Sequence, residues 1–278
     1  MKLCDSPLAP WKAHLSLGFA QVSGRTSMIS REHYGPLVVQ RPLYPEGPEV
    51  CQVLIIHPPG GIAGGDELQI SCQLDNRSVV QMTTPGATKW YESFGREASQ
   101  SVKLAVSDRS VCEWIPQENI VFDKAALSTD VEVHVDKNAI FFGWEFTALG
   151  RHRTLYPYEH GDLKQSVKLF YDGDLVFRER AHVNPNHLVD GSPILNGQVS
   201  YGSMYLVGVP RNEKLLDQAR LVSDASAHCG VTWMDSVFVA RWVGNNVEDG
   251  HRVFEKLWCL LRPYYLGKEA VSPRIWST

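Results

Sequence analysis

A histidine and an aspartate stand at the two ends of residues 57–66, HPPGGIAGGD. Imidazole and carboxylate groups bind divalent metals and take part in acid–base chemistry. The prolines between them stiffen the chain, and the glycines permit positive φ and close approach of other segments. This glycine loop fixes Asp66 either as a functional carboxylate or as an acceptor for the amides of its own turn. The residues expected to shape the loop are His57, Pro58, Pro59, Gly60, Gly61, Gly64 and Gly65.

The glycine spacing does not produce a phosphate-binding loop. In a P-loop, lysine and a hydroxyl residue follow the last glycine, whereas Asp66 and Glu67 follow here and would repel phosphate. The sequence also lacks the dinucleotide pattern GxGxxG, the serine-hydrolase pattern GxSxG and the zinc pattern HExxH. A β-rich metal hydrolase that uses His57, Asp66 and another histidine remains one alternative. A β-sandwich module that binds sugars on aromatic side chains is another.

Three further carboxylates stand within or beside the expected strands. Glu145 lies in the apolar run FFGWEFT, where a charge is costly unless it is paired or hydrated. It therefore needs either a partner, such as Arg151 or Arg153, or a water-filled interior. Glu49 precedes an apolar strand and Glu179 lies on the return strand of an expected hairpin. Each of these two can also be an ordinary solvated or ion-paired residue.

Most of the chain has the pattern of β-strands. Residues 131–135 alternate strictly between apolar and polar side chains, which is typical of a half-buried strand. Asp172-Gly173 stands between the runs 166–171 and 175–180, and such a pair predicts a tight hairpin turn. Other strands are expected at residues 37–40, 50–56, 67–74, 139–147, 199–209 and 231–243.

Two segments in the last third follow a helical period instead. Residues 213–223 place their large apolar side chains on one face, and Asn212 is suited to cap the helix. Residues 247–261 form the second, with Asn245 or Asn246 as its cap and Arg262-Pro263 as its end. Because strands and helices do not alternate, a doubly wound parallel sheet is disfavoured. We expect one mainly β domain over residues 1–278, with an irregular segment at 184–197.

Composition excludes several classes of protein. The 278 residues are 44% hydrophobic, enough for a large core without disulfide staples. The net charge of −4 and the absence of a basic run argue against nucleic acid as a partner. No apolar run approaches the length of a membrane span, and the first residues lack the apolar core of a signal peptide, so a cytoplasmic location is expected. The six cysteines are scattered without a CxxC pair, which favours free thiols in or near the core.

Several segments carry a resemblance to a known family. They are GPLVVQRPLYP at 35–45, HPPGGIAGGD at 57–66, TTPGATKWY at 83–91, WIPQENIVF at 114–122, GREA at 95–98 and LRPYYLGK with PRIW at 261–276. In order and spacing they resemble the urease accessory protein family called UreD in many bacteria and UreH in some. Ala63 stands where the family pattern has valine, and residues 184–200 match the pattern poorly.

The resemblance implies a maturation factor and not an enzyme. Members of that family bind the urease apoprotein together with a helical accessory protein, F, and, through F, a GTPase, G. The complex inserts nickel into urease. The family fold is mainly β, with two sheet layers in a helical, sandwich-like winding and a few helices. The family is thought to offer nickel a water-filled internal passage, so nickel would be cargo in transit and no cofactor would be tightly bound.

A passage for nickel must bind the ion weakly and at several places, since a strong site would not release it. Spaced single carboxylates suit this need better than a compact cluster of histidine and cysteine ligands. The candidate passage residues are Asp66, Glu145, Glu49 and Glu179. Aromatic and polar side chains in the matching segments either belong to turns and the core or form a partner surface, since aromatic side chains are common in both places. These are Lys89, Trp90, Tyr91, Gln117, Tyr264 and Tyr265.

Overall fold

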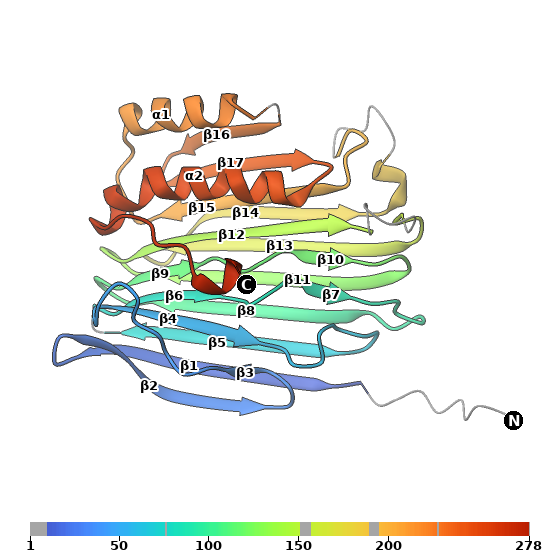
Figure 1. The fold of residues 1–278 in the computed structure, drawn as a ribbon, viewed down its shortest axis with the longest axis horizontal. Coiled ribbons are helices and arrows are strands. Elements are labelled where there is room, and N and C mark those ends of the chain that lie inside the picture. Colours follow the sequence, from blue (N-terminus) through green and yellow to red (C-terminus); the bar gives the residue numbers. More distant parts are fainter. Residues whose placement is uncertain (1–9, 76, 151–156, 189–194, 227, 278) are drawn as a thin grey trace, which may run out of the picture.

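The fold consists of two facing β-sheets with two α-helices on the outside of one of them (Figure 1). The computed structural model describes residues 10–75, 77–150, 157–188, 195–226 and 228–277. The seven-stranded sheet has the order β14 (Asp174–Val183), β13 (Gly161–Tyr171), β11 (Ala125–Val135), β8 (Ala98–Val106), β5 (Glu67–Asp75), β1 (Lys12–Val22) and β2 (Arg25–Tyr34).

The ten-stranded sheet lies opposite. Its main path is β16 (Cys229–Met234), β17 (Val237–Gly244), β15 (Ser200–Val207), β12 (Ile140–Leu149), β9 (Val111–Trp114), β6 (Val79–Thr83), β4 (Val50–Ile56) and β3 (Val38–Val39). Two short strands extend it beside β12: β10 (Asn119–Val121), which pairs with β12, and β7 (Thr88–Trp90), which pairs with β10.

Along the middle of the chain, successive strands alternate between the two sheets. β4, β6, β9 and β12 are parallel neighbours in the ten-stranded sheet. β5, β8, β11 and β13, which intervene in the sequence, are parallel neighbours in the seven-stranded sheet. Parallel strands need a long crossover, and here the strand of the opposite sheet supplies it in place of a helix. The chain thus winds as a two-layer solenoid, and the expected mainly β, helically wound architecture is confirmed.

Antiparallel hairpins close both ends of the solenoid. β1 and β2 form one, and β13 and β14 form another around Asp172 (φ 51°) and Gly173 (φ 88°), as the D-G pair predicted. The expected single strand at 231–243 is wrong. It is two antiparallel strands, β16 and β17, with Asp235 at φ 43° in the turn between them. The Met-Asp-Ser sequence of this turn lacks the glycine that signals a hairpin.

Helices α1 (Glu213–Asp224) and α2 (Val247–Leu266) cover the outer face of the ten-stranded sheet (Figure 1). Asn212 caps α1 as predicted, since its side-chain oxygen accepts a hydrogen bond from Leu215 N at 3.0 Å. Asn246 precedes α2 but makes no side-chain cap bond, and Pro263 lies inside that helix. The predicted end at Pro263 is therefore wrong: α2 ends at Leu266, and Gly267, whose φ of 70° suits a glycine cap, follows it.

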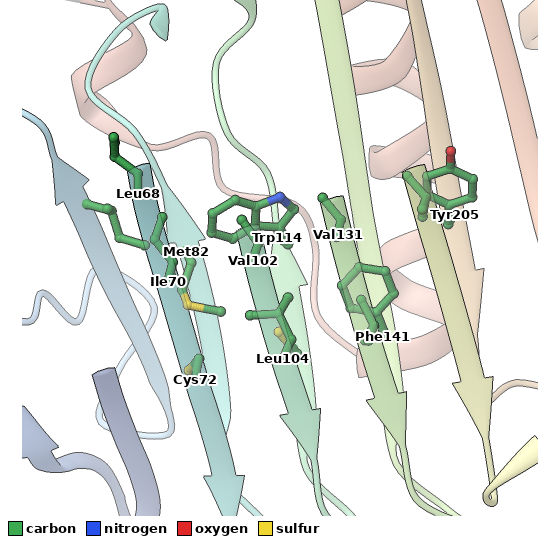
Figure 2. Packing of buried hydrophobic residues seen from close by; sticks show 14 of the residues in the cluster. Leu68, Ile70, Cys72, Met82, Val102, Leu104, Trp114, Val131, Phe141 and Tyr205 are labelled. Atoms are coloured by element: carbon green, nitrogen blue, oxygen red, sulfur yellow. The ribbon is translucent and has the colours of Figure 1, made fainter. Parts of the chain in front are cut away.

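The main core fills the space between the sheets. Alternate residues of β5 point inward, and Figure 2 shows Leu68, Ile70 and Cys72 beside Met82 and Trp114 of the opposite sheet. Cys51, Cys72 and Cys112 are buried free thiols, as predicted. A second core, which is rich in aromatic side chains, lies between the ten-stranded sheet and the helices. Short 3₁₀ helices occupy Pro185–Leu188 and Arg274–Ser277; the rest of the irregular 184–197 segment falls partly outside the described residues.

Candidate functional site

The glycine loop connects β4 to β5 and is fixed by close contacts. Gly60 (φ 76°) and Gly65 (φ 91°) adopt backbone conformations that favour glycine. Gly64 is needed for a different reason: a Cβ there would lie 2.0 Å from the carbonyl oxygen of Ser93. The loop therefore packs directly against the backbone of the segment that leads into β8.

Asp66 is buried at the end of this loop and holds it closed. Its Oδ1 accepts a hydrogen bond from Trp11 N at 2.8 Å, and its Oδ2 accepts one from Ala63 N at 2.9 Å. It is 7% exposed and lines neither of the two cavities described below. This geometry favours the role of a turn residue for Asp66 over that of a passage ligand.

A cavity of about 280 Å³ opens beside the glycine loop; we call it the loop cavity. Its wall combines His57 and the segment Thr84–Lys89 with side chains from both sheets, including Leu68, Ile70 and Trp114 (Figure 2). Exposed Pro85 and Gly86 lie at its rim. Its remaining polar lining consists of Gln100, Gln117, Asn119 and Glu145.

A smaller cavity of about 40 Å³ lies farther along the space between the sheets; we call it the strand cavity. Strands β11 to β15 line it, and most of the lining side chains are polar. Gln165 donates a hydrogen bond from Nε2 to Thr147 Oγ1 at 3.1 Å, and Tyr201 Oη donates to Gln165 Oε1. Polar groups inside a sandwich core are costly unless they are satisfied, and these hydrogen bonds satisfy several of them.

Glu145 on β12 lines both cavities. Trp114 Nε1 donates a hydrogen bond to its Oε1 at 2.6 Å. The protein surrounds the carboxyl group, and burial raises its pKa to about 7 although the bond from Trp114 opposes the rise. The side chain nevertheless keeps partial exposure, because the cavities reach it. The two cavities fit one of the environments predicted for Glu145, an interior path, and the predicted partners Arg151 and Arg153 lie outside the described residues.

Glu179 on β14 lines the strand cavity on its far side from the glycine loop. Its carboxylate accepts hydrogen bonds from Ser203 Oγ and Tyr205 Oη, both at 3.2 Å. Arg241 on β17 pairs with it at 2.9 Å, and the Arg241 side chain is 59% exposed. Glu179 thus stands where the cavity approaches the surface, with a solvated arginine over it.

His57 is half-buried where β4 ends, at the wall of the loop cavity. Its Nε2 atom is buried and has no hydrogen-bond partner among the described residues. Burial lowers the pKa of the imidazole, although the nearby negative charge of Asp66 opposes the shift. The ring is therefore neutral at physiological pH, the form that can donate a lone pair.

The family follows from comparison with known proteins. A model of the UreD urease accessory protein family matches residues 12–277. The chain belongs to this family. The UreD of Methylobacillus flagellatus is 40% identical over 96% of this chain and 95% of its own length. That of Nitrosospira multiformis is 38% identical over 99% of both chains, and that of Azoarcus sp. is 40% identical over 96% of this chain and 94% of its own.

Membership in the UreD family makes this chain a urease accessory protein that takes part in urease maturation and is not a catalyst. The hydrolase and sugar-binding alternatives are therefore wrong. In the described residues, no group of three or more histidine, cysteine, aspartate and glutamate side chains is arranged to hold a metal ion. Within the same part of the chain, no helix is long and apolar enough to cross a membrane.

Two of the residues predicted for the partner surface are buried inside the protein, and neither lines the two cavities. Trp90 is 1% exposed and donates a hydrogen bond to Asn119, and Tyr265 is 7% exposed and donates one to Glu113. Both side chains therefore contribute to the core of this chain. Large apolar side chains in strands and amphipathic helices are usually buried, and the sequence alone did not show which faces were covered.

The other candidates differ in their settings. Tyr91 and Tyr264 are 41% and 37% exposed and are available to partners. Lys89 and Gln117 line the loop cavity. Glu49 lies at the surface, pairs with Lys268 at 3.1 Å and lines neither cavity. Of the four predicted passage residues, the structure brings only Glu145 and Glu179 to the same cavity.

Sequence reasoning missed a buried ionic cluster behind the site. Glu113 on β9 accepts hydrogen bonds from Arg262 Nε at 2.8 Å, from Trp258 Nε1 at 3.1 Å and from Gln81 Nε2 at 2.8 Å. Arg262 also pairs with Glu46, at 2.6 Å and 2.8 Å. The sequence did contain a signal for this cluster. Glu113 lies in the apolar run VCEW, just as Glu145 lies in FFGWEFT, and a charge in an apolar run is costly unless it is paired.

Proposed function

We propose that this UreD chain is a scaffold that binds the urease apoprotein and the accessory proteins F and, through F, G, and that nickel passes between its two sheets on the way to urease. The observation that carries the passage is the position of Glu145, the one side chain that the loop cavity and the strand cavity share among the residues lining them. Glu179 extends the same polar path toward the far edge of the sandwich.

The chemistry of this path suits an ion in transit. Carboxylate, amide and hydroxyl oxygens are weak ligands for nickel compared with a preformed cluster of imidazoles and thiolates. Glu145 and Glu179 are spaced single carboxylates, each with a hydrogen-bond donor that competes with a metal. An ion can therefore be held briefly at each and then released, as conduction requires.

The scaffold part of the proposal is tested by co-expression. The tagged chain is expressed with the urease subunits and the accessory proteins, and urease activity is measured with and without it. We expect capture of apo-urease and loss of activity when this chain is omitted. Full activity without it, and no capture of urease, would overturn the scaffold.

The passage part is tested by Glu145→Gln, which removes the negative charge but keeps the shape of the side chain. Glu49→Gln is the matched control, because Glu49 lies at the surface outside both cavities. At limiting nickel, Glu145→Gln should lower urease activation while the amount of captured apo-urease stays the same. Equal activation by the two variants would count against a route through Glu145.

A further inference from the structure

The two sheets end unevenly beside β14. This strand is the last of the seven-stranded sheet, and it lies across from β15, since the ring centroids of Phe177 and Tyr205 are 5.3 Å apart. The ten-stranded sheet continues past β15 with β17 and then β16 (Figure 1). Arg241 of β17 still reaches back to Glu179 of β14. The ten-stranded sheet therefore extends beyond its partner at this end.

The inward face of β16 is open. Residues directly opposite each other in antiparallel strands share a face. Thr232 and Met234 are opposite Val239 and Val237, which belong to the main core between the sheets. Thr232 and Met234 face the same way, yet both are exposed, Met234 at 44%. A Cβ at Gly230, the next residue of this face, would have no atom within 4 Å. We call these three residues of β16, Gly230, Thr232 and Met234, the β16 shelf.

The outer edge of β14 is the second open feature. The strand is ten residues long, and in the described part of the chain it pairs with β13 alone. From Phe177 to Val183 this pairing is uninterrupted. A terminal strand presents unpaired N–H and C=O groups along one side, which can pair with another strand. Strands pair about 4.8 Å apart and stacked sheets lie about 10 Å apart, so a strand added to β14 would lie over the β16 shelf.

Charge on the outward face of β14 selects the incoming strand. Arg178 and Arg180 are exposed, and neither forms an ion pair with another described residue. They face outward, because the alternate residues Phe177 and Glu179 lie between the sheets. A second copy of β14 would place arginines beside arginines, which is destabilising. Acidic side chains at alternate positions would instead be attracted, and the apolar side chains between them would cover Met234.

The other charges near this edge are paired or lie at its end. Glu179 pairs with Arg241 at 2.9 Å, and His182 pairs with Asp162. Asp174 is exposed, but it is the first residue of β14 and precedes the regularly paired segment. The middle of the edge therefore keeps the positive charge of its two outward arginines.

We propose that β14 accepts an extended, acidic segment of a partner protein as a further strand of the seven-stranded sheet. Apolar side chains of the segment cover the β16 shelf, and the acidic side chains that alternate with them lie beside Arg178 and Arg180. Main-chain hydrogen bonds to β14 supply affinity, and the alternating side chains supply selectivity. This inference rests on the proposed scaffold and deepens it by naming one docking surface; it is independent of the route of nickel.

The test uses the full-length chain and two synthetic peptides, one alternating valine with glutamate and the other alternating valine with lysine. Fluorescence anisotropy should show binding of the valine–glutamate peptide and at least about tenfold weaker binding of the valine–lysine peptide. Hydrogen–deuterium exchange should show that the first peptide slows the exchange of β14 amides that are not bonded to β13. Equal affinities for the two peptides, or β14 edge amides that are already protected in the free chain, would overturn the proposal.

Two charge reversals on edge strands of the same sheet locate the site. Arg180→Glu should weaken binding of the valine–glutamate peptide by at least about fivefold and strengthen binding of the valine–lysine peptide. Arg31→Glu is the matched control, because Arg31 is an exposed arginine on β2 at the opposite end of the sheet. It should leave both affinities unaltered. Identical affinities for the two variants would show that the peptide does not bind along β14.

The scaffold and the edge site fail in different ways. If neither peptide binds while co-expression still captures apo-urease, the scaffold stands and the β14 site does not. If the valine–glutamate peptide binds along β14 while co-expression captures no urease, the site stands and the proposed scaffold does not. Both arginines are exposed, so the variants are expected to fold, and the exchange measurement on the unaltered chain decides the matter if they do not.

Discussion

Glu145 combines a titratable group with a place that two cavities share. Its pKa of about 7 follows from burial and means that protons compete with a cation for the carboxylate near neutral pH. The bond from Trp114 keeps the side chain in one orientation in both protonation states, because the indole N–H donates to an oxygen in either.

This shift makes stability depend on pH. The carboxyl has a pKa raised from 4.5 to about 7 in the folded state, so the folded chain binds more protons than the unfolded chain between those values. Stability therefore falls as the pH rises through this window. Glu145→Gln lacks the effect, and its free energy of unfolding relative to the wild type should increase by about 2 kcal/mol from pH 4.5 to pH 8, allowing for hydration by the cavities. Urea titrations at the two pH values check this, and a difference that is independent of pH would contradict it.

Asp66, in contrast to Glu145, lies outside both cavities and stabilises the glycine loop. Asp66→Ala removes the acceptors for Trp11 N and Ala63 N, and we expect it to lower the free energy of unfolding by about 2 kcal/mol. The neighbouring Glu67→Ala is the control: its exposed pair with Lys12 should contribute less than about 0.5 kcal/mol. Nickel transfer per folded molecule should be unchanged for Asp66→Ala. A clear loss of nickel transfer by an Asp66→Ala protein of normal stability would instead indicate that Asp66 is a passage residue.

Among the elements, the glycine loop borders the loop cavity, and α2 is anchored to the ten-stranded sheet. The loop forms part of the rim, and α2 fixes the ten-stranded sheet through Arg262 and Glu113. The glycine loop is held by the close approach of Gly64 to the backbone of Ser93, and α2 is held by the buried ion pair of Arg262 with Glu113.

Gly64 should tolerate no side chain. Gly64→Ala places a Cβ 2.0 Å from the Ser93 carbonyl oxygen, so the two segments must separate, and we expect a loss of at least about 3 kcal/mol or failure to fold. Gly60→Ala meets no atom within 4 Å and carries only the strain of a φ of 76°, which should cost about 1 kcal/mol. Thermal unfolding of both variants separates close approach from backbone strain. A Gly64→Ala protein as stable as Gly60→Ala would disprove the contact.

The attachment of α2 should be equally sensitive. Arg262→Met leaves the buried carboxylates of Glu113 and Glu46 without their shared cation, which should cost about 3–5 kcal/mol. Arg252 on the same helix makes only exposed pairs, and Arg252→Met should cost less than about 0.5 kcal/mol. Chemical denaturation compares the two. Equal stability of the variants would mean that Arg262 does not anchor the helix.

The sequence predicted elements better than it predicted their surroundings. Local signals located β4, the Asp172-Gly173 hairpin and the start of α1, since periodicity, turn residues and caps act within a few residues. The end of α2 was missed because tertiary packing carries a helix past Pro263, where local rules would stop it. For the site, a charge in an apolar run identified Glu145. The sequence could not show that Glu179 lines a cavity whereas Glu49 does not. That difference depends on which strands the winding brings together.

At the scale of the whole molecule, the winding explains why a path between the sheets can exist. Each turn of the solenoid adds one strand to each sheet, so the two sheets face each other along the whole stack (Figure 1). Apolar side chains fill most of it, and polar side chains line the loop and strand cavities. The proposed passage uses this interior layer, and the proposed partners would bind the outer surface.

We propose that nickel reaches urease along Glu145 and Glu179. The most direct measurement is the nickel content of urease purified from cells that express the complex with Glu145→Gln and Glu179→Gln combined. Glu49→Gln serves as the control, and capture of apo-urease confirms assembly. We predict that urease from the double variant contains a small fraction of the nickel found with the control at equal assembly. Full nickel content in urease from the double variant would show that the ion takes another route.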